Sequence, residues 1–312
     1  MSISKVNGVA WASIAKLTGR AKADLAKFGG QSVPASVVYF LTTYSGAELA
    51  FSFRKLASSA QNCIEVTNDS GTATDIGFDS NGYLDTASIA SHCSTGNGRI
   101  SKWYDQSGNN RHATQTSTSQ MPLIYQSGSM RTENGKASAY FDGGDRLVIA
   151  SAQVHTGSFF ATSVIKVPND RNGSILNQDD PYTPTRFRVA QYLRTGSANS
   201  GTGRVVVFNT SGSNFADNSA AHSNSNQFQL SSYATSSGTI DCRLNESSNG
   251  TSSYSGTLKT GSHELAIGSN VHGSTPAAYH GGDIQELILW DGDQPSARAN
   301  IESAVDTYYS IP

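Results

Sequence analysis

The sequence of 312 residues predicts an all-β protein, folded as a two-sheet sandwich with a short C-terminal helix and an extended N-terminal arm. Two observations support this. From Met130 onward, short apolar runs of strand length alternate with loops rich in Gly, Ser and Asn, a pattern typical of antiparallel sandwiches. The first residues instead repeat a unit with too little apolar surface to fold alone. The chain therefore divides into an arm, residues 1–36, and a sandwich domain, residues 37–312.

The arm contains an eleven-residue repeat, in which lysine recurs at positions 5, 16 and 27 and glycine follows three residues after each. This period is compatible with a right-handed helical coil, but a glycine in every copy costs about 1 kcal/mol relative to alanine in a helix. Short extended pieces separated by glycine turns are the better interpretation. We interpret the arm as an anchor that orders on a partner, and the alternative is a flexible leader. The apolar residues expected to make that contact are Val6, Trp11, Ile14, Leu17, Leu25 and Phe28.

The first part of the domain is predicted to contain strands and one short helix. Apolar, β-branched runs predict strands at Val37–Leu41, Leu49–Leu56 and Cys63–Val66. The segment 85–92 predicts a helix with Asp85 as its N-cap.

The stretch from Ile100 to Thr114 begins as a strand and then breaks into a polar turn. The residues 105–110 are of the types that hydrogen-bond to nearby backbone or tolerate positive φ. Two roles are open. Asp105, Gly108 and Asn109 form a structural turn while Trp103 or Tyr104 fills the core, or the tip presents Asp105, Asn109 and His112 to a ligand. The structural role is favoured, because no second group of ligand-type residues lies nearby in the sequence.

The second half predicts antiparallel strands followed by a closing helix. Residues 158–167 are apolar on both faces, which predicts a central strand, and residues 296–309 form an amphipathic helix that packs on the sandwich. The predicted strands are Ala137–Phe141, Arg146–Ile149, Ser158–Val167, Arg186–Gln191, Arg204–Phe208, Phe228–Ala234, Ile240–Leu244, His263–Ile267 and Asp283–Trp290.

Composition excludes several classes of function. Charged residues make up only 15% of the chain and the formal net charge is −2, so there is no electrostatic argument for nucleic-acid binding. No apolar run reaches membrane-spanning length, and the start of the chain does not resemble a signal peptide. The three cysteines, Cys63, Cys93 and Cys242, are interpreted as buried thiols, although one disulfide remains an alternative. The spacing of His263, His272 and His280 fits no short metal motif, so neither a metal nor a cofactor is expected.

Residues 103–109, Trp-Tyr-Asp-Gln-Ser-Gly-Asn, resemble a signature of α-L-arabinofuranosidase B catalytic domains. They also resemble lectin-like relatives of these domains in structural proteins of tailed phages. Further segments of the signature lie in the same order at residues 50–56, 74–78, 82–85, 135–143 and 281–290. The resemblance implies a concanavalin-like β-sandwich, or jelly roll, and the repeat arm resembles leaders of phage structural proteins.

The same resemblance implies a retaining glycosidase with two carboxylates, a nucleophile and a general acid. The family's nucleophile lies on a strand that corresponds best to Val205–Asn209, and its acid follows a turn that corresponds to Ile267–Asn270. Neither segment carries a carboxylate, so the sequence predicts no catalytic residue and no enzymatic activity. The remaining acids were expected in exposed pairs; examples are Glu246, Glu264, Asp283 and Glu286.

Three functions remain. The first is a virion structural protein of a tailed phage, such as a capsid decoration or a tail-fibre adhesin, whose arm binds other virion proteins. The second is a carbohydrate-binding protein of the same architecture, in which Tyr182, Tyr192 or Tyr279 stacks on host surface glycans. The third is a glycoside hydrolase of arabinofuranosidase type. The first two are compatible and are favoured, with a homo-oligomer on the virion surface and no nucleic-acid or membrane partner.

Overall fold

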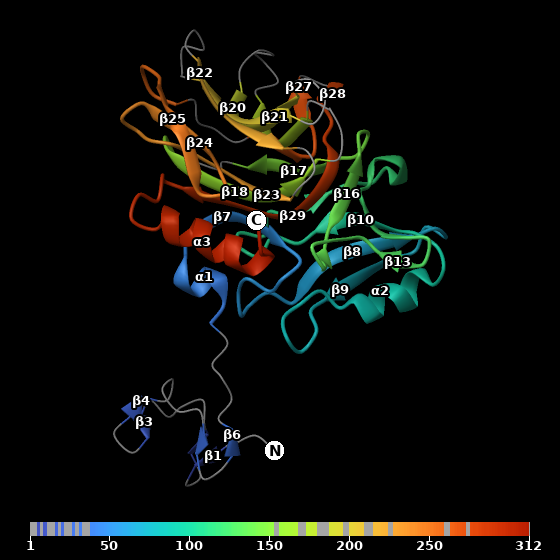
Figure 1. The fold of residues 1–312 in the computed structure, drawn as a ribbon. Coiled ribbons are helices and arrows are strands. Elements are labelled where there is room, and N and C mark those ends of the chain that lie inside the picture. The colour runs from blue at the N-terminus through green and yellow to red at the C-terminus, as the bar shows by residue number, and fades with distance from the viewer. Residues whose placement is uncertain are drawn as a thin grey trace.

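The computed structural model of the chain is a β-sandwich with an N-terminal arm (Figure 1). It describes the short strands of the arm and residues 38–152, 156–167, 173–179, 187–195, 200–208, 215–223, 227–258, 263–272 and 275–311. The helices of the domain are α1 (Phe40–Thr43), α2 (Thr86–Cys93) and α3 (Arg298–Tyr309), and a 3₁₀ turn covers Thr118–Gln120.

The strands are short and follow one another closely along the chain. In order they are β7 (Ala47–Ser52), β8 (Asn62–Asn68), β9 (Ala73–Gly77), β10 (Gly98–Trp103), β11 (Ala113–Thr114), β12 (Leu123–Gln126), β13 (Ser129–Met130), β14 (Thr132–Glu133), β15 (Lys136–Ala137), β16 (Ala139–Asp142), β17 (Leu147–Ala152), β18 (Phe159–Lys166), β19 (Gly173–Asp179), β20 (Phe187–Thr195), β21 (Ser200–Phe208), β22 (Phe215–Ser223), β23 (Phe228–Ala234), β24 (Thr239–Leu244), β25 (Ser247–Ser253), β26 (His263–Ile267), β27 (Asn270–His272), β28 (Thr275–Ala277) and β29 (Gly281–Asp291).

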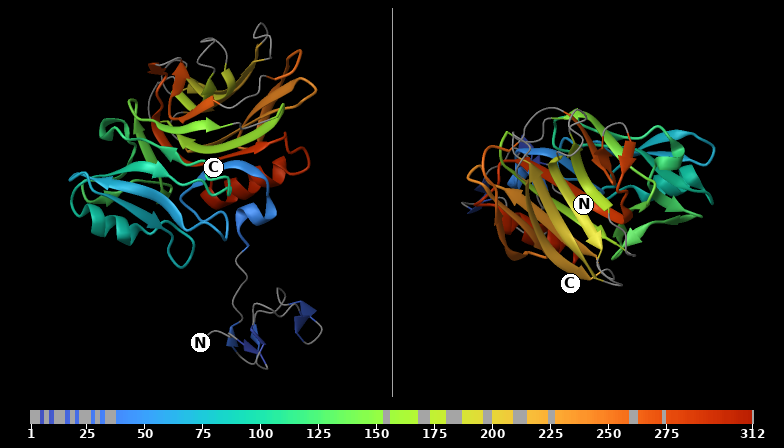
Figure 2. Two further views of the ribbon diagram at one scale, coloured as in Figure 1. Left: turned by 180° about the vertical axis from the view of Figure 1, so that it is seen from behind. Right: turned by 90° about the horizontal axis from the view of Figure 1, so that it is seen from above.

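Antiparallel pairing arranges these strands in two facing layers. One layer runs β7–β29–β18–β23–β24–β25. The other runs β17–β26–β19–β20–β21–β22. Figure 2 shows the layers stacked, with the group β9–β8–β10–β12 and helix α2 extending to one side. The predicted all-β sandwich with a C-terminal helix is confirmed.

Strand β29 is covered on both faces, which explains its continuous apolar sequence. Leu287 and Leu289 face the core between the two layers, whereas Ile288 and Trp290 face helices α1 and α3. The strand therefore separates the main core from a second apolar layer under the helices. β18 lies between β29 and β23 and is buried along almost its whole length, as the two-sided apolar pattern predicted.

Both longer helices form where the sequence predicted them. The Asp85 carboxylate accepts a hydrogen bond from the Ser88 N–H at 3.1 Å and caps the N-terminus of α2. Helix α3 buries Ile301, Val305 and Tyr309 against the sandwich. Tyr308 is half-buried and packs at the edge of this face.

The strand predicted at 37–41 is wrong. The backbone turns into the four-residue helix α1, and Phe40 packs against Tyr44 and Trp290 with ring centroids 4.9 and 6.5 Å apart. These rings pack on the outer face of β29, and this packing outweighs the β propensity of the segment. Val38 is 66% exposed and has no sheet neighbour in the described part of the chain.

The arm contains three short antiparallel pairs, spaced at the period of the repeat. They are β1 (Lys5–Val6) with β2 (Val9–Ala10), β3 (Lys16–Leu17) with β4 (Arg20–Ala21), and β5 (Lys27–Phe28) with β6 (Gln31–Ser32). Each pair is thus one copy of the extended piece that the repeat predicted. The boundary after residue 36 stays a prediction.

Cys63, Cys93 and Cys242 are all free thiols and all buried. Burial raises the pKa of the Cys63 thiol well above its ordinary value. In the described ranges, no helix has the length and hydrophobicity needed to cross a membrane.

Candidate functional site

The polar turn after β10 is held by the carboxylate of Asp105. Its Oδ1 accepts hydrogen bonds from the N–H groups of Ala50 (3.0 Å) and Ser107 (2.9 Å), and its Oδ2 accepts from the Arg111 N–H at 3.1 Å. Asp105 is 8% exposed, so the carboxylate is satisfied within the protein. Gly108 follows at φ 96°, a conformation that favours glycine.

This turn covers the edge of β7 that does not face β29. The Gln106 N–H donates to the Ala50 carbonyl at 2.8 Å, and the Gln106 side chain donates to the Ser52 carbonyl at 2.9 Å. The Asn109 side chain donates to the carbonyl of Glu48 at 3.1 Å. An open strand edge is a site for unwanted pairing, and here the turn supplies the missing hydrogen bonds. Asp105, Gly108 and Asn109 therefore lie together in a structural turn.

Trp103 is fully buried at the end of β10 and stacks on Phe53, with ring centroids 4.7 Å apart. Tyr104 is half-buried, and its hydroxyl donates to Asp75 at 2.7 Å. His112 accepts from the Asp105 N–H at 3.1 Å through Nδ1. Burial lowers the pKa of His112, which is consistent with a neutral ring in this role.

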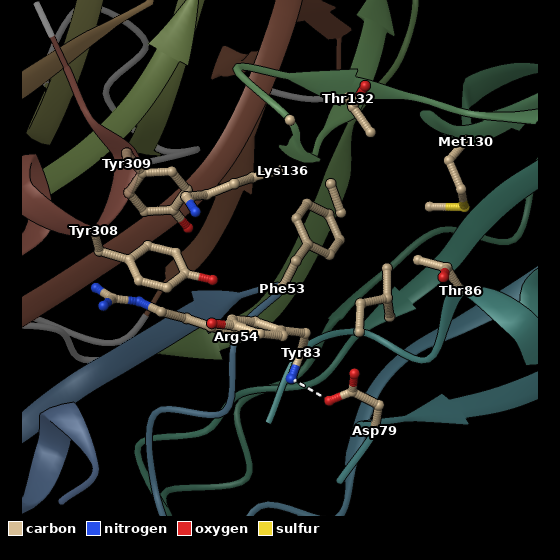
Figure 3. Close-up of a pocket in the computed structure, with 13 residues that line it drawn as sticks. Phe53, Arg54, Asp79, Tyr83, Thr86, Met130, Thr132, Lys136, Tyr308 and Tyr309 are labelled. Atoms are coloured by element: carbon tan, nitrogen blue, oxygen red, sulfur yellow. Dashed lines mark hydrogen bonds between the residues drawn. The ribbon is translucent and has the colours of Figure 1, made fainter. Parts of the chain in front are cut away.

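A cavity lies next to Phe53, between the loop before α2, the hairpin β14–β15 and the end of α3 (Figure 3). Its volume is about 510 Å³, a size suited to a small ligand. Phe53, Leu84 and Met130 give it an apolar lining. The polar side chains on the lining are Arg54, Asp79, Tyr83, Thr86, Thr132, Lys136, Tyr308 and Tyr309. We call this cavity the tyrosine pocket.

A buried ion pair supports one wall of the tyrosine pocket. Arg54 Nη2 and Nε donate to Glu286 Oε1 and Oε2 at 2.7 and 2.8 Å, a bidentate arrangement. Ser52 Oγ and the Tyr309 hydroxyl donate to Glu286 Oε2 at 2.7 and 3.2 Å. Burial lowers the pKa of Arg54, but the adjacent Glu286 carboxylate outweighs this effect and raises it. The guanidinium charge is therefore neutralised inside the wall.

Tyr308 projects from this wall between two cations. The Arg54 guanidinium carbon lies 4.1 Å, and the Lys136 ammonium 4.4 Å, from the centre of its ring. The Tyr83 ring lies 6.4 Å from the Tyr308 ring at an angle of 35° and is 50% exposed. Burial raises the pKa of Tyr308, so its hydroxyl is protonated at neutral pH and can donate a hydrogen bond.

Two of the acids expected in exposed pairs are buried instead. Glu286 has no exposed surface, and Asp283 is 3% exposed and accepts a hydrogen bond from Ser138 Oγ at 2.8 Å. Both lie on β29, a strand that is buried on both faces. The expectation of exposed pairs is therefore wrong for these two acids. Glu246 and Glu264 are exposed, and Glu264 pairs loosely with Arg146 at 3.9 Å.

A second polar cluster is buried at the turn after β26. His280 is fully buried, and among the described residues neither of its ring nitrogens has a hydrogen-bond partner; the same holds for the buried Ser174 Oγ and Ser269 Oγ. The backbone joins these residues, since the His280 N–H donates to the Gly268 carbonyl at 2.8 Å and the Ser174 N–H to the Ala278 carbonyl at 2.9 Å. His280 is thus an interior residue. Burial lowers its pKa to about 4.

Asp145 lies beside the same turn. Gly268, at φ 83°, packs so closely that a Cβ there would lie 2.4 Å from the Phe141 ring and 3.3 Å from the Asp145 carbonyl oxygen. Asp145 is 3% exposed, and its carboxylate accepts the Asp142 N–H at 2.8 Å. Burial raises the pKa of Asp145 to about 7.

Several predicted site residues lie outside the described parts of the chain. These are Trp11, Ile14 and Leu25 of the arm, Tyr182, Asn209, and the side chains of Val6, Leu17, Phe28, Tyr192, His263 and His272. Tyr279 is half-buried, and Gln120 Nε2 lies 3.4 Å from its hydroxyl. Within the described ranges, no group of three or more His, Cys, Asp or Glu residues is placed to hold a metal ion.

The sequence did not single out the tyrosine pocket. Tyr83 lies in one of the recognised segments, and Lys136 lies in another, but nothing in the sequence indicates that these two residues meet Tyr308 at the end of the chain. The one available signal is Tyr83 itself, an aromatic residue in the turn segment Asp79–Tyr83 rather than in a strand.

The fold defines the class of protein as a concanavalin-like β-sandwich. A GH54 α-L-arabinofuranosidase soaked with a cyclic sulfate inhibitor is similar over 83% of this chain and 62% of its own, with 16% identity and a TM-score of 0.61. A mutant GH54 α-L-arabinofuranosidase soaked with 4-nitrophenyl α-L-arabinofuranoside has 15% identity and a TM-score of 0.58. An arabinofuranosidase complexed with arabinofuranosyl-α-1,2-xylobiose has 15% identity and a TM-score of 0.55.

Each of these enzymes is longer than the part that matches, since the chain spans 62% of their length. Neither a protein-family model nor a curated protein matches the sequence. The likeness shows the fold, and it corrects one expectation. The prediction that the chain is not an enzyme is contradicted, because these three structures of the same fold are glycoside hydrolases.

Proposed function

We propose that the chain is a carbohydrate-binding protein of the concanavalin-like fold, that the tyrosine pocket binds the saccharide, and that the arm attaches the domain to a larger assembly. The observation that carries the proposal is the half-exposed Tyr83 ring, which lies beside Tyr308 over a pocket of about 510 Å³. A sugar ring has an apolar C–H face, and covering an exposed aromatic ring with it removes apolar area from water.

The polar groups of the pocket can form hydrogen bonds with the hydroxyl groups of a sugar. Thr86 and Thr132 are exposed hydroxyls on its lining, and the Tyr308 hydroxyl is a protonated donor. Polar groups at fixed positions beside apolar side chains orient a small ligand in its site. Phe53 is held below them by its stacking on Trp103, so the pocket rests on a rigid part of the core.

The assembly that fits the arm is a tailed-phage virion, with the domain on the particle surface as a capsid decoration or tail-fibre adhesin. Support comes from the resemblance of the arm to phage leaders and from its three separate strand pairs, whose edges can add to the sheet of another virion protein. Several arms presented by a homo-oligomer would bind more strongly together than singly.

The saccharide proposal is tested by binding of the full chain to an array of bacterial surface glycans. We expect binding that Tyr83→Ala abolishes, while Tyr104→Ala, which changes a half-buried tyrosine outside the pocket, leaves it unchanged. Binding that survives Tyr83→Ala would move the site elsewhere on the domain.

The attachment proposal is tested by incorporation into particles. A chain without residues 1–36 is expected to remain free, and Trp11→Ala to reduce incorporation without changing the melting temperature of the domain. Normal incorporation of the armless chain would place the attachment surface on the sandwich.

A second candidate function is hydrolysis of arabinofuranosides. The observation that favours it is the buried polar cluster at the Ile267–Asn270 turn, where Asp145 has a pKa of about 7, the range suited to a general acid. Turnover of 4-nitrophenyl α-L-arabinofuranoside that Asp145→Asn lowers by at least about 100-fold would support it. Turnover that is absent, or unchanged in this variant, would exclude Asp145 from such a role.

A further inference from the structure

Of the charged side chains on the lining of the tyrosine pocket, Arg54 alone has an ion-pair partner among the described residues. The Arg54 charge is neutralised by the bidentate Glu286 carboxylate. The Asp79 carboxylate keeps its charge but is held in its own turn, where Oδ1 accepts the N–H groups of Asn81 and Tyr83 at 2.8 and 2.9 Å. Lys136 is the cation that remains.

Lys136 is half-buried on β15, and none of the described carboxylates forms an ion pair with it. Glu133, which lies directly across the hairpin, pairs with Lys166 instead at 2.7 Å. The Lys136 ammonium lies against the Tyr308 ring on the pocket wall (Figure 3). A lysine held beside a cavity by a ring, with three donors and no anionic partner, is suited to receive an anion from a ligand.

The anion that fits is a single carboxylate on a sugar. A phosphate dianion is usually held by several charges or by an arginine fork, and the one arginine among the described residues of this pocket is already occupied. The half-exposed Tyr83 ring and the apolar lining need a ligand with an apolar face. A hexuronic acid combines this face with one negative charge.

We propose that the tyrosine pocket selects an acidic saccharide, in which a hexuronate ring stacks on Tyr83 and its carboxylate binds the Lys136 ammonium. This inference rests on the proposed function and names its ligand class. The charge pairing would be weakened by salt, because both groups lie near solvent.

The test compares tetragalacturonate with its methyl ester, which has the same rings without the charge, by titration calorimetry on the full chain. We expect the acid to bind about 10-fold more tightly, the ratio that one charge-assisted hydrogen bond supplies. In Lys136→Gln, the acid should bind no more tightly than the ester, and the affinity for the ester should be unchanged. Tyr83→Ala should weaken both ligands.

Lys55→Gln is the matched control, because Lys55 is a nearby half-buried cation outside the pocket lining. It should leave the ratio unchanged, and the melting temperature of each variant shows that it folds. Equal binding of the acid and the ester would overturn the acidic ligand class and leave saccharide binding standing. Binding of neither would count against both this inference and the proposed function.

Discussion

At the scale of single residues, the Arg54–Glu286 pair is a buried ion pair that joins β7, β29 and α3. Glu286 has no exposed surface, and it accepts from Arg54, Ser52 and Tyr309. Glu286→Ala leaves a buried guanidinium without a partner, so we expect it to destabilise the fold by about 3–5 kcal/mol. Urea unfolding followed by tryptophan fluorescence measures this.

Two further variants make the experiment specific. Glu264→Ala removes an exposed acid with a loose ion pair and should change stability by less than about 1 kcal/mol. The double variant Arg54→Met/Glu286→Leu should recover part of the loss, since neither buried charge remains. A change for Glu286→Ala as small as that for Glu264→Ala would contradict the assigned role.

Two buried titratable residues near the Ile267–Asn270 turn should give opposite pH dependences. Asp145 has a raised pKa of about 7, so its stabilising contribution is complete below its ordinary value of 3.8 and is lost as the pH rises to 7. His280 has a lowered pKa of about 4, so its contribution is complete above 6.5 and is lost as the pH falls to 4. In the wild type the two effects offset each other between pH 4 and 6.5.

Single variants distinguish the pH dependence of Asp145 from that of His280. Relative to the wild type, Asp145→Asn should lose stability as the pH is lowered from 6.5 to 4, and His280→Gln should gain it. Each slope should approach about 1.4 kcal/mol per pH unit. Melting temperatures measured across this range check the signs, and parallel curves for all three proteins would show that neither group titrates as assigned.

At the scale of elements, the turn at residues 105–109 acts as a cover for the edge of β7. Asp105→Ala would leave the N–H groups of Ala50, Ser107 and Arg111 without their acceptor. Each unsatisfied buried group costs about 1–3 kcal/mol, so we expect a loss of several kcal/mol and fast hydrogen exchange at the Ala50 amide. Asn109→Ala, which removes donors from an exposed side chain, should cost about 1 kcal/mol or less. Equal losses would show that Asp105 has no special role.

Elements were predictable where local sequence determines them. β23 and β26 have the bounds that their apolar runs predicted, and α2 begins at the cap that Asp85 provides. β22 and β25 were missed because they are rich in Ser, Asn and Ala, and their strand form depends on pairing with neighbouring strands. The sequence of segment 37–41 has high β propensity, which predicts a strand. Nothing in that local sequence indicates that its aromatic side chains pack on β29.

The turn at residues 105–109 and the tyrosine pocket also differ in how far the sequence predicts them. The turn at 105–109 could be interpreted from sequence, because its own side chains hydrogen-bond to backbone groups a few residues away. The tyrosine pocket could not, because Tyr83, Lys136 and Tyr308 come from three distant segments. The network below it likewise joins Arg54 to Glu286 across 232 residues of chain. Pairing of β7 with β29 brings Arg54 to Glu286, a bridge joins Tyr83 to Arg54, and the packing of α3 adds Tyr308.

At the scale of the whole molecule, the described strands of the arm form no strand pair with the sandwich. Each described arm strand pairs only within its own copy of the repeat, and the core clusters contain residues from Phe40 onward. Strand pairs of two residues are marginal in water without a packed face. We therefore predict that a chain starting at Val37 melts cooperatively at the same temperature as the full chain. In the full chain, arm amides should exchange within seconds while those of β18 and β29 are protected. A lower melting temperature after truncation, or slow exchange in the arm of the isolated protein, would mean that the arm packs on its own domain and is not held ready for a partner.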